Sequence, residues 1–234
     1  MKLTVIVPFY NEEQYLEQSV NRLTKHKIFS QIILADDGST DNSSKIAQNL
    51  ELTTKNIKYI KSNLNGGKGS ILDLSRKLVN TSHVIVHDAD MEYFPEDIVE
   101  MFKLVLKNPD TMILGTRFNG NLPRKNIYLR TYYGNILISM FFSLVHYFRI
   151  SDVATCYKLM PSKFFKDLKL TEKGFGVDIE ILSKYLNYNR SLIEVPIKYE
   201  GRTYSDGKKI KLSDGFIWLF LTLKFRLKSL FDFR

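Results

Sequence analysis

Short apolar runs alternate with amphipathic segments through the first half of the chain, and this rhythm constrains the fold more than any other feature of the sequence. The apolar runs predict strands at residues 3–8, 31–36, 57–62, 83–87 and 111–115. The amphipathic segments predict helices at residues 12–25, 42–50, 68–79 and 96–107. This alternation predicts an α/β fold with a mostly parallel sheet flanked by helices. Ligands of such open sheets bind at the carboxyl ends of the strands, where several polar segments of this chain fall.

The pattern changes after residue 116. We expect a loop and then, in order, a long apolar helix, a short strand, a helix, a strand and a last helix, at residues 127–148, 154–160, 177–189, 192–196 and from near Asp214. No linker, low-complexity run or internal repeat separates the two halves. The sequence therefore predicts one domain over residues 1–234, in which the halves 1–116 and 117–234 receive different ligands.

The basic residues are unevenly distributed. The formal net charge is +9, and segments 117–149 and 202–234 are strongly basic while the remainder is close to neutral. The same segments hold the longest apolar stretches, 136–145 and 216–221, which are much shorter than the ~20 residues of a membrane-spanning helix. Basic residues beside apolar helices are typical of a protein on an anionic membrane face, although burial in the core also explains such helices. A nucleic-acid groove fits less well, because aliphatic residues are interleaved as often as base-stacking aromatic ones.

Two features indicate the cellular compartment. Cys156 is the single cysteine and cannot form an intramolecular disulfide. The N-terminal apolar run is too short for a signal peptide and is interrupted at Pro8. Both features predict a protein of the reducing cytoplasm.

Polar residues follow the second predicted strand in the segment Asp36–Asp41. A carboxylate of Asp36 or Asp37 could hold the base or ribose of a nucleotide, and the turn would present N–H groups that favour anions at a helix N-terminus. An Asp-Gly turn with a helix cap at Ser39 or Asp41 explains the same residues without a ligand.

Two carboxylates follow the fourth predicted strand, in Asp88-Ala89-Asp90. Residues two apart on an extended segment point the same way, so both carboxylates can face one small volume. A diphosphate bound there would add negative charge, which a divalent cation between the groups would offset. Such a cation would also stabilise a departing diphosphate.

A glycine-rich segment, Asn63–Gly69, leads from the third predicted strand into a helix. It is similar to a phosphate-binding loop but lacks the spacing of the P-loop of nucleoside triphosphatases. Lys68 in this segment either contacts a phosphate or lies in solvent.

Taken as a set, segments 7–13, 36–41, 65–69 and 88–90 resemble in order and spacing the family 2 glycosyltransferases. The resemblance implies the GT-A fold, a UDP- or GDP-sugar donor, Mg²⁺ or Mn²⁺ at Asp88 and Asp90, and inversion at the anomeric carbon. The residues that it implies for donor binding in this half are Pro8, Tyr10, Glu12, Asp36, Asp37, Lys68, Asp88 and Ala89.

The second half resembles one branch of that family, the polyprenyl-phosphate sugar synthases that include dolichyl-phosphate mannose synthases. The segments that carry this likeness are 115–118, 152–158, 174–175 with Asp178 and Glu180, 194–199, and Arg202 with 207–210. The likeness implies a dolichyl or undecaprenyl phosphate acceptor near Arg117, Arg130 and Asn135. It also implies that Arg202, Lys208 and Lys209 close over the donor diphosphate.

This chain departs from the pattern of that branch in two ways. The first acid of its Gly-Phe-x-x-Glu-x-Glu element is Asp178, one carbon shorter than glutamate. Many members carry membrane-spanning helices at the C-terminus, whereas this chain ends at Arg234 without one. We therefore expect a peripheral protein on the cytoplasmic face of a membrane.

The acceptor decides which residues are catalytic. A lipid monophosphate is already an anion at neutral pH, because its second pKa is near ~6. The metal and Arg202 would then stabilise the leaving diphosphate, and Asp152 would orient the acceptor or a lysine. A sugar hydroxyl, the acceptor of a soluble polysaccharide-elongating enzyme, would need Asp178 or Glu180 as a general base. A nucleotidyltransferase and a non-enzymatic membrane scaffold are the remaining alternatives.

Overall fold

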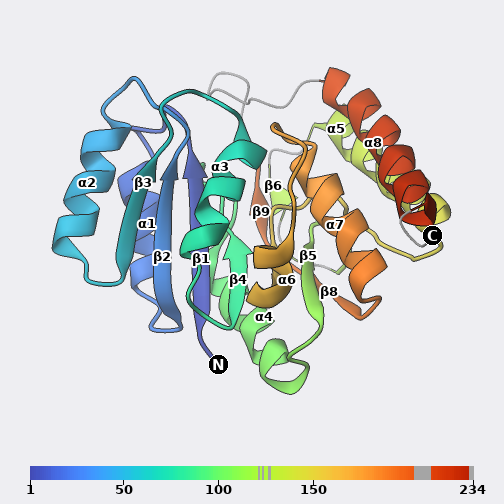
Figure 1. Cartoon of the computed structure of the whole chain (residues 1–234), viewed down its shortest axis with the longest axis horizontal. Helices are drawn as coiled ribbons and strands as arrows, with labels where there is room; N and C mark the ends of the chain where they lie inside the picture. The colour runs from blue at the N-terminus through green and yellow to red at the C-terminus, as the bar shows by residue number, and fades with distance from the viewer. Residues whose placement is uncertain (121, 123, 126–127, 203–211, 232–234) are drawn as a thin grey trace.

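The computed structural model describes residues 1–120, 122, 124–125, 128–202 and 212–231. Its main element is a mixed sheet of seven strands in the order β3-β2-β1-β4-β7-β5-β8 (Figure 1). The strands are β1 (Leu3–Phe9), β2 (Phe29–Asp36), β3 (Ile57–Lys61), β4 (His83–Val86), β5 (Met112–Thr116), β7 (Lys158–Pro161) and β8 (Leu192–Pro196). Only β7 runs antiparallel to its neighbours in this sheet. The predicted mostly parallel α/β sheet is therefore confirmed.

Helices cover both faces of the sheet. In Figure 1, α3 lies in front of the sheet and α1 lies behind it. The helices of this core are α1 (Leu16–Thr24), α2 (Ser43–Thr53), α3 (Lys68–Ser75) with the short 3₁₀ helix η1 (Arg76–Leu78), α4 (Pro95–Lys107), α6 (Ser162–Asp167) and α7 (Val177–Tyr188). All seven residues of β1 are buried, as expected of a central parallel strand that is covered on both faces.

The chain changes direction across the sheet at β1. The strands β1, β2 and β3 follow one another to one side, and β4 then pairs with β1 on its other side. Such a reversal leaves a crevice at the carboxyl ends of the two strands. The segments after β1 and β4, which hold Glu12 and Asp88, therefore meet at the same edge of the sheet.

Two long helices stand at the end of the sheet that is farthest from β3. They are α5 (Leu129–His146) and α8 (Leu212–Phe231), which run side by side, and α8 also contacts α7 (Figure 1). Among the described residues, no helix is long and apolar enough to cross a membrane.

Several elements differ from the sequence prediction. The strand expected at 154–160 begins only at Lys158, because the residues before it form turns against Tyr93, whose hydroxyl accepts the Cys156 N–H. A small parallel sheet of β6 (Arg124–Lys125) and β9 (Tyr199–Glu200) was not predicted, since two-residue strands leave no periodic signal. The helix α6 was missed for the same reason of length.

We predict that Tyr185→Phe lowers the free energy of unfolding by about 1 kcal/mol. The buried Tyr185 hydroxyl accepts the Met112 N–H at 2.8 Å and lies 2.9 Å from the Asp110 carbonyl oxygen, so it ties α7 to β5. Urea denaturation of the variant measures the loss. The matched control is Tyr188→Phe on the same helix, where the side chain is 58% exposed and no change is expected.

Candidate active site

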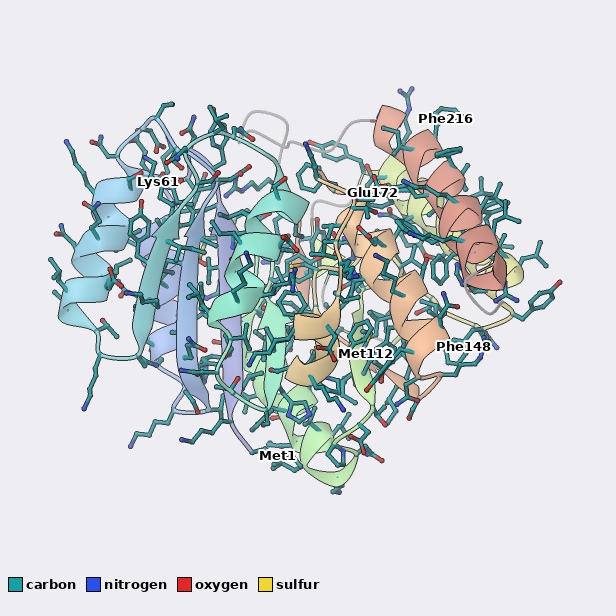
Figure 2. The ribbon with its side chains drawn as sticks, viewed as in Figure 1. Met1, Lys61, Met112, Phe148, Glu172 and Phe216 are labelled. Carbon is teal, nitrogen blue, oxygen red and sulfur yellow. The ribbon has the colours of Figure 1, made fainter. Side chains whose placement is uncertain are left out.

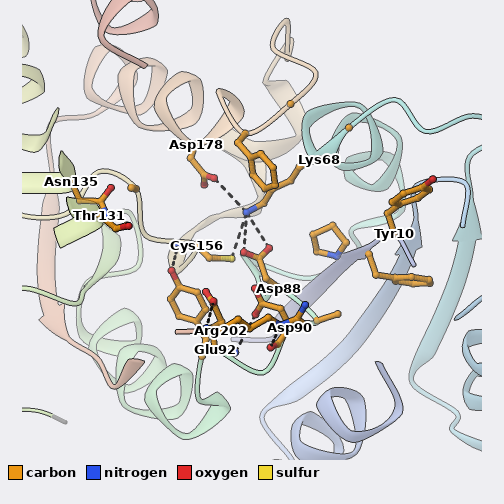
Figure 3. A pocket seen from close by; sticks show the side chains of 18 of the residues that line it. Tyr10, Lys68, Asp88, Asp90, Glu92, Thr131, Asn135, Cys156, Asp178 and Arg202 are labelled. Carbon is orange, nitrogen blue, oxygen red and sulfur yellow. Dashed lines mark hydrogen bonds and ion pairs between the residues drawn. The ribbon is translucent and has the colours of Figure 1, made fainter. Parts of the chain in front are cut away.

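A cavity of about 390 Å³ lies at the carboxyl ends of β1 and β4 and continues to α5 and α8 (Figure 3). Most residues that the sequence singled out line it. These are Pro8, Tyr10, Glu12, Asp37, Lys68, Asp88, Ala89, Asp90, Arg117, Arg130, Asn135, Asp178 and Arg202. Three others, Asp36, Asp152 and Glu180, are buried beside the cavity without lining it. Lys208 and Lys209 lie outside the described residues.

The two aspartates after β2 have different surroundings. Asp36 is fully buried and accepts hydrogen bonds from the Ser39 N–H, the Ser44 hydroxyl and the Tyr59 hydroxyl at 2.7, 2.5 and 3.0 Å. Asp36 therefore fits the alternative in which this segment forms a turn without a ligand, because protein groups already occupy its carboxylate. Asp37 faces the cavity instead, so it is the carboxylate of this pair that a nucleotide can reach.

Asp37 also holds the loop that begins α3. Its two oxygens accept the Gly66 and Gly67 N–H groups at 2.9 and 2.7 Å. Burial raises the pKa of Asp37 above its usual value, although the two hydrogen bonds act in the opposite direction. Gly67 has φ +88°, a backbone conformation that favours glycine.

The next turn of α3 is covered by a second loop. The Gly69 N–H donates to the Lys173 carbonyl oxygen at 2.6 Å, and a Cβ at Gly69 would lie 1.8 Å from the Glu172 carbonyl oxygen. Only glycine fits at position 69, so this glycine of the motif allows α3 to pack closely against the loop that contains Glu172 and Lys173. Glu180 fixes the covering loop by accepting the Thr171 and Glu172 N–H groups, which explains its complete burial.

Lys68 points into a cluster of charged groups at the centre of the cavity (Figure 3). Its Nζ lies 3.0 Å from Asp88 Oδ1, 3.4 Å from Asp178 Oδ2 and 3.8 Å from Cys156 Sγ, and its side chain is 9% exposed. Burial alone would lower the pKa of Lys68, but the carboxylates of Asp178 and Asp88 outweigh it and hold the pKa well above the usual value. The structure thus excludes the solvent-exposed alternative for Lys68.

Asp178 lies between two lysines. Its second oxygen accepts from Lys158 Nζ at 2.8 Å, and Lys158 is itself buried. Burial would raise the pKa of Asp178, yet the ammonium groups of Lys158 and Lys68 hold it below the usual value. A carboxylate with a lowered pKa is a weak base. Sequence reasoning assigned no role to Lys158, because nothing local marks a lysine as buried.

Asp88 and Asp90 have the chemistry of a partial cation site. The Asp90 carboxylate accepts the Glu92 N–H at 3.1 Å, and burial, followed by the charges of Glu92 and Asp88, raises its pKa well above the usual value. A divalent cation would offset this excess of negative charge. Among the described residues no three acidic, histidine or cysteine side chains form a cluster that could hold a metal. Two carboxylates still fit Mg²⁺ or Mn²⁺, which take further ligands from phosphates and water.

Arg202 closes the acidic end of the cavity. Its Nη2 lies 2.7 Å from Glu12 Oε2, its Nε donates to the Asp90 carbonyl oxygen at 2.8 Å, and its guanidinium lies over the Tyr15 ring at 4.4 Å. The backbone N–H of Arg202 donates to Glu92 Oε1 at 2.7 Å. These contacts hold the positively charged guanidinium of Arg202 beside Asp90.

The opposite end of the cavity is basic and partly apolar. Thr131 and Asn135 face it from one side of α5, and Figure 3 places them across the cavity from Tyr10. Arg130 is exposed there, and Ile138 and Trp218 add apolar surface. The sequence pointed to Arg130 and Asn135 but not to Thr131 or Trp218, which carry no motif.

Arg117 reaches the cavity while it is held from behind by Asp152. The guanidinium makes two contacts with this carboxylate, from Nε to Oδ2 at 2.7 Å and from Nη2 to Oδ1 at 2.8 Å, and both side chains are buried. Asp152 was predicted to orient the acceptor or a lysine, and its side-chain partner in the structure is Arg117. No local signal in the sequence marks this pair.

Comparison with known proteins identifies the family. The profile described as Glycosyl transferase family 2 matches residues 4–169. The chain belongs to glycosyltransferase family 2. This match includes β1 from Thr4 onward, β2 to β5, the carboxylates after β2 and β4, and all of β7.

Relatives of this family 2 glycosyltransferase include enzymes named for lipid phosphates. It is 26% identical over 245 residues to a UDP-N-acetylglucosamine–dolichyl-phosphate N-acetylglucosaminyltransferase of Methanococcus voltae, with 97% of each chain covered. It is 26% identical over 213 residues to a dolichol-phosphate mannosyltransferase of Pyrococcus furiosus, with 89% of this chain and 59% of that protein covered.

Solved structures show the same fold. Glucosyl-3-phosphoglycerate synthase of Mycobacterium tuberculosis, in complex with Mn²⁺, UDP and glucosyl-3-phosphoglycerate, superposes with a TM-score of 0.73 at 13% identity. The match covers 97% of this chain and 79% of that protein. The expected GT-A fold is therefore confirmed.

We predict that Asp152→Asn lowers the free energy of unfolding by roughly 3–5 kcal/mol, because it leaves the Arg117 charge buried without its counter-ion. Chemical denaturation measures this loss. The double variant Arg117→Met/Asp152→Leu removes both charges and should recover most of it.

A matched control is the exposed pair of Lys125 and Glu200, whose side chains are 67% and 44% exposed. Glu200→Gln should change the free energy of unfolding by less than about 1 kcal/mol. Equal losses at the two pairs would contradict a structural role for the buried one.

Proposed function

We propose that this enzyme transfers a hexose from a UDP- or GDP-sugar to a polyprenyl phosphate at the cytoplasmic face of a membrane, with inversion at the anomeric carbon. UDP is the donor nucleotide that the comparisons favour, because a relative is named for a UDP-sugar and a structural neighbour was solved with UDP. The dolichyl or undecaprenyl phosphate acceptor is supported by the names of the relatives and by the arguments below.

The acceptor assignment depends on three carboxylates, those of Asp178, Asp152 and Glu180, none of which is available as a general base. A sugar hydroxyl acceptor would need a general base. Asp178 is paired with Lys158 and Lys68, Asp152 is paired with Arg117, and Glu180 lies outside the cavity. The structure therefore favours an acceptor that is already anionic, such as a phosphate monoester.

The donor belongs at the acidic end of the cavity. Asp37 would contact the nucleoside, and Pro8, Tyr10, Glu12 and Ala89 line the same end. Asp88 and Asp90 would hold Mg²⁺ or Mn²⁺, which, when bound, stabilises the charge on the departing diphosphate. Arg202 lies where it can hold that diphosphate as well.

The acceptor phosphate belongs at the basic end. Arg130, Thr131 and Asn135 face the cavity from the first turns of α5, and Arg117 lies deeper. Arginine suits a phosphate because its N–H groups form paired, charge-assisted hydrogen bonds. The adjoining Ile138 and Trp218 would contact the first part of an apolar tail.

An exposed apolar face extends this end of the cavity outward. Apolar residues that are 44–79% exposed recur at three- and four-residue intervals. They are Leu129, Tyr133, Leu137, Met140 and Leu144 along α5 with Tyr147 directly after it, and Phe216, Phe220, Leu223 and Leu227 along α8. Figure 2 shows the side chains of both helices at the edge of the molecule farthest from β3. Extended apolar patches mark interaction sites, and a bilayer suits two adjacent apolar stripes with basic residues nearby.

We expect nucleotide release to depend on both lipid and metal. Purified protein is incubated with UDP- and GDP-sugars, Mg²⁺ or Mn²⁺, and polyprenyl phosphate in detergent, and free nucleotide diphosphate is measured. Asp88→Asn should lower this release by roughly 100-fold or more, because a group that stabilises transition-state charge is lost. If a water-soluble sugar stimulates nucleotide release as strongly as the lipid does, the acceptor is not a polyprenyl phosphate. The alternative of a soluble enzyme that elongates a polysaccharide would then replace it.

We expect the apolar face to bind membranes. Leu137→Gln/Leu144→Gln should weaken binding to anionic phospholipid vesicles by roughly 10-fold or more in a flotation assay, because each side chain loses apolar burial in the bilayer. The matched control is Leu52→Gln/Leu106→Gln, at exposed leucines of α2 and α4. Equal effects of the two double variants would contradict membrane docking by this face.

A further inference from the structure

We propose that Lys68 holds Asp88 until the donor binds, so that the divalent cation and the nucleotide-sugar diphosphate enter the site together. The inference rests on the proposed function, in that it takes Asp88 as a metal ligand and a nucleotide sugar as donor. It assigns to Lys68 the role of a positioning residue that couples metal binding to donor binding.

The geometry places the lysine where the metal would bind. Lys68 Nζ lies 3.0 and 3.2 Å from the two oxygens of Asp88. The side chains of Lys68 and Asp88 are 9% and 25% exposed, so bulk water screens this ion pair less than it screens a surface pair. A divalent cation that approaches Asp88 must therefore compete with a positive charge that already contacts both oxygens.

The four charges of the cluster are balanced. Two carboxylates, Asp88 and Asp178, face two ammonium groups, those of Lys68 and Lys158. If Asp88 turned to a metal alone, both lysines would share the single carboxylate of Asp178 in a buried site. Unpaired charge is costly there, so the cation alone should bind weakly.

A donor diphosphate removes this obstacle. It supplies oxygen ligands that the metal needs beyond Asp88 and Asp90, and it offers Lys68 a new anionic partner. Asp178 Oδ2 is already 3.4 Å from Lys68 Nζ, so the lysine remains paired while it leaves Asp88.

Only the side chain needs to move. The backbone on both sides of Lys68 is fixed, because Asp37 accepts the Gly67 N–H and Lys173 accepts the Gly69 N–H. The exchange of partners is therefore a rotation of one lysine side chain.

The test is the affinity for Mn²⁺, measured by electron paramagnetic resonance of the free ion with and without UDP. In the wild-type protein we expect weak Mn²⁺ binding that UDP tightens, and by linkage Mn²⁺ tightens UDP by the same factor. Lys68→Met should bind Mn²⁺ without UDP roughly 10-fold more tightly than the wild type, and the tightening by UDP should shrink correspondingly.

Three further measurements separate the possible causes. Lys68→Arg keeps the charge and should keep the wild-type coupling. Lys103→Met, at a lysine of α4 whose side chain is 63% exposed, removes a charge that does not line the cavity and should leave the Mn²⁺ affinity unchanged. The circular dichroism spectrum and melting temperature establish that each variant is folded.

The outcomes distinguish this inference from the proposed function. If the wild type binds neither UDP nor a UDP- or GDP-sugar in the presence of Mn²⁺, the proposed donor fails and the inference with it. If nucleotide and Mn²⁺ bind together but Lys68→Met binds Mn²⁺ alone no more tightly than the wild type, the role of Lys68 is wrong and the donor assignment stands.

Discussion

The hydrogen bonds that one carboxylate accepts from two backbone N–H groups organise the active site. Asp37 directly follows β2 and accepts the N–H groups of Gly66 and Gly67, which directly precede α3. Because this contact fixes where α3 starts, it also fixes where Lys68 points. Lys68 in turn joins Asp88, at the end of β4, to Asp178 on α7. Elements far apart in the sequence therefore meet through a chain of polar contacts that starts at Asp37.

Much of the fold could be predicted because the signals are local. The strands β1, β2, β4 and β5 are mostly apolar runs. The carboxylates at Asp37, Asp88 and Asp90 follow β2 and β4 closely, where ligands of open sheets bind. The place of β7 between β4 and β5 could not be predicted, since an apolar run does not specify its neighbours or its direction. The hydrogen-bond and ion-pair partners of site residues could not be predicted for the same reason. Nothing near Asp36 or Asp152 in the sequence indicates that Tyr59 or Arg117 occupies its oxygens.

The two ends of the cavity have different physical characters, and this difference organises the second half of the chain. The acidic end is built from loops that the sheet holds in place, and Lys68 and Arg202 pair with several of its carboxylates. The other end is built from α5 and α8, whose outer faces expose apolar side chains. A substrate with a charged head and an apolar tail matches this gradient, whereas a small hydrophilic acceptor would leave the outer faces of both helices without a partner.

The antiparallel direction of β7 has a consequence for how such enzymes can diversify. β5 ends at the edge of the sheet that carries the cavity, and β7 begins at that same edge. The intervening residues, 117–157, therefore leave the sheet and return to it at one place, and they include α5, Arg117 and Asp152. Insertions, deletions or exchange of this excursion would leave every pairing of the seven-stranded sheet in register, although the excursion also carries β6, which pairs with β9. The part of the proposed acceptor site that lies on α5 can thus change in evolution while the seven-stranded sheet stays unchanged.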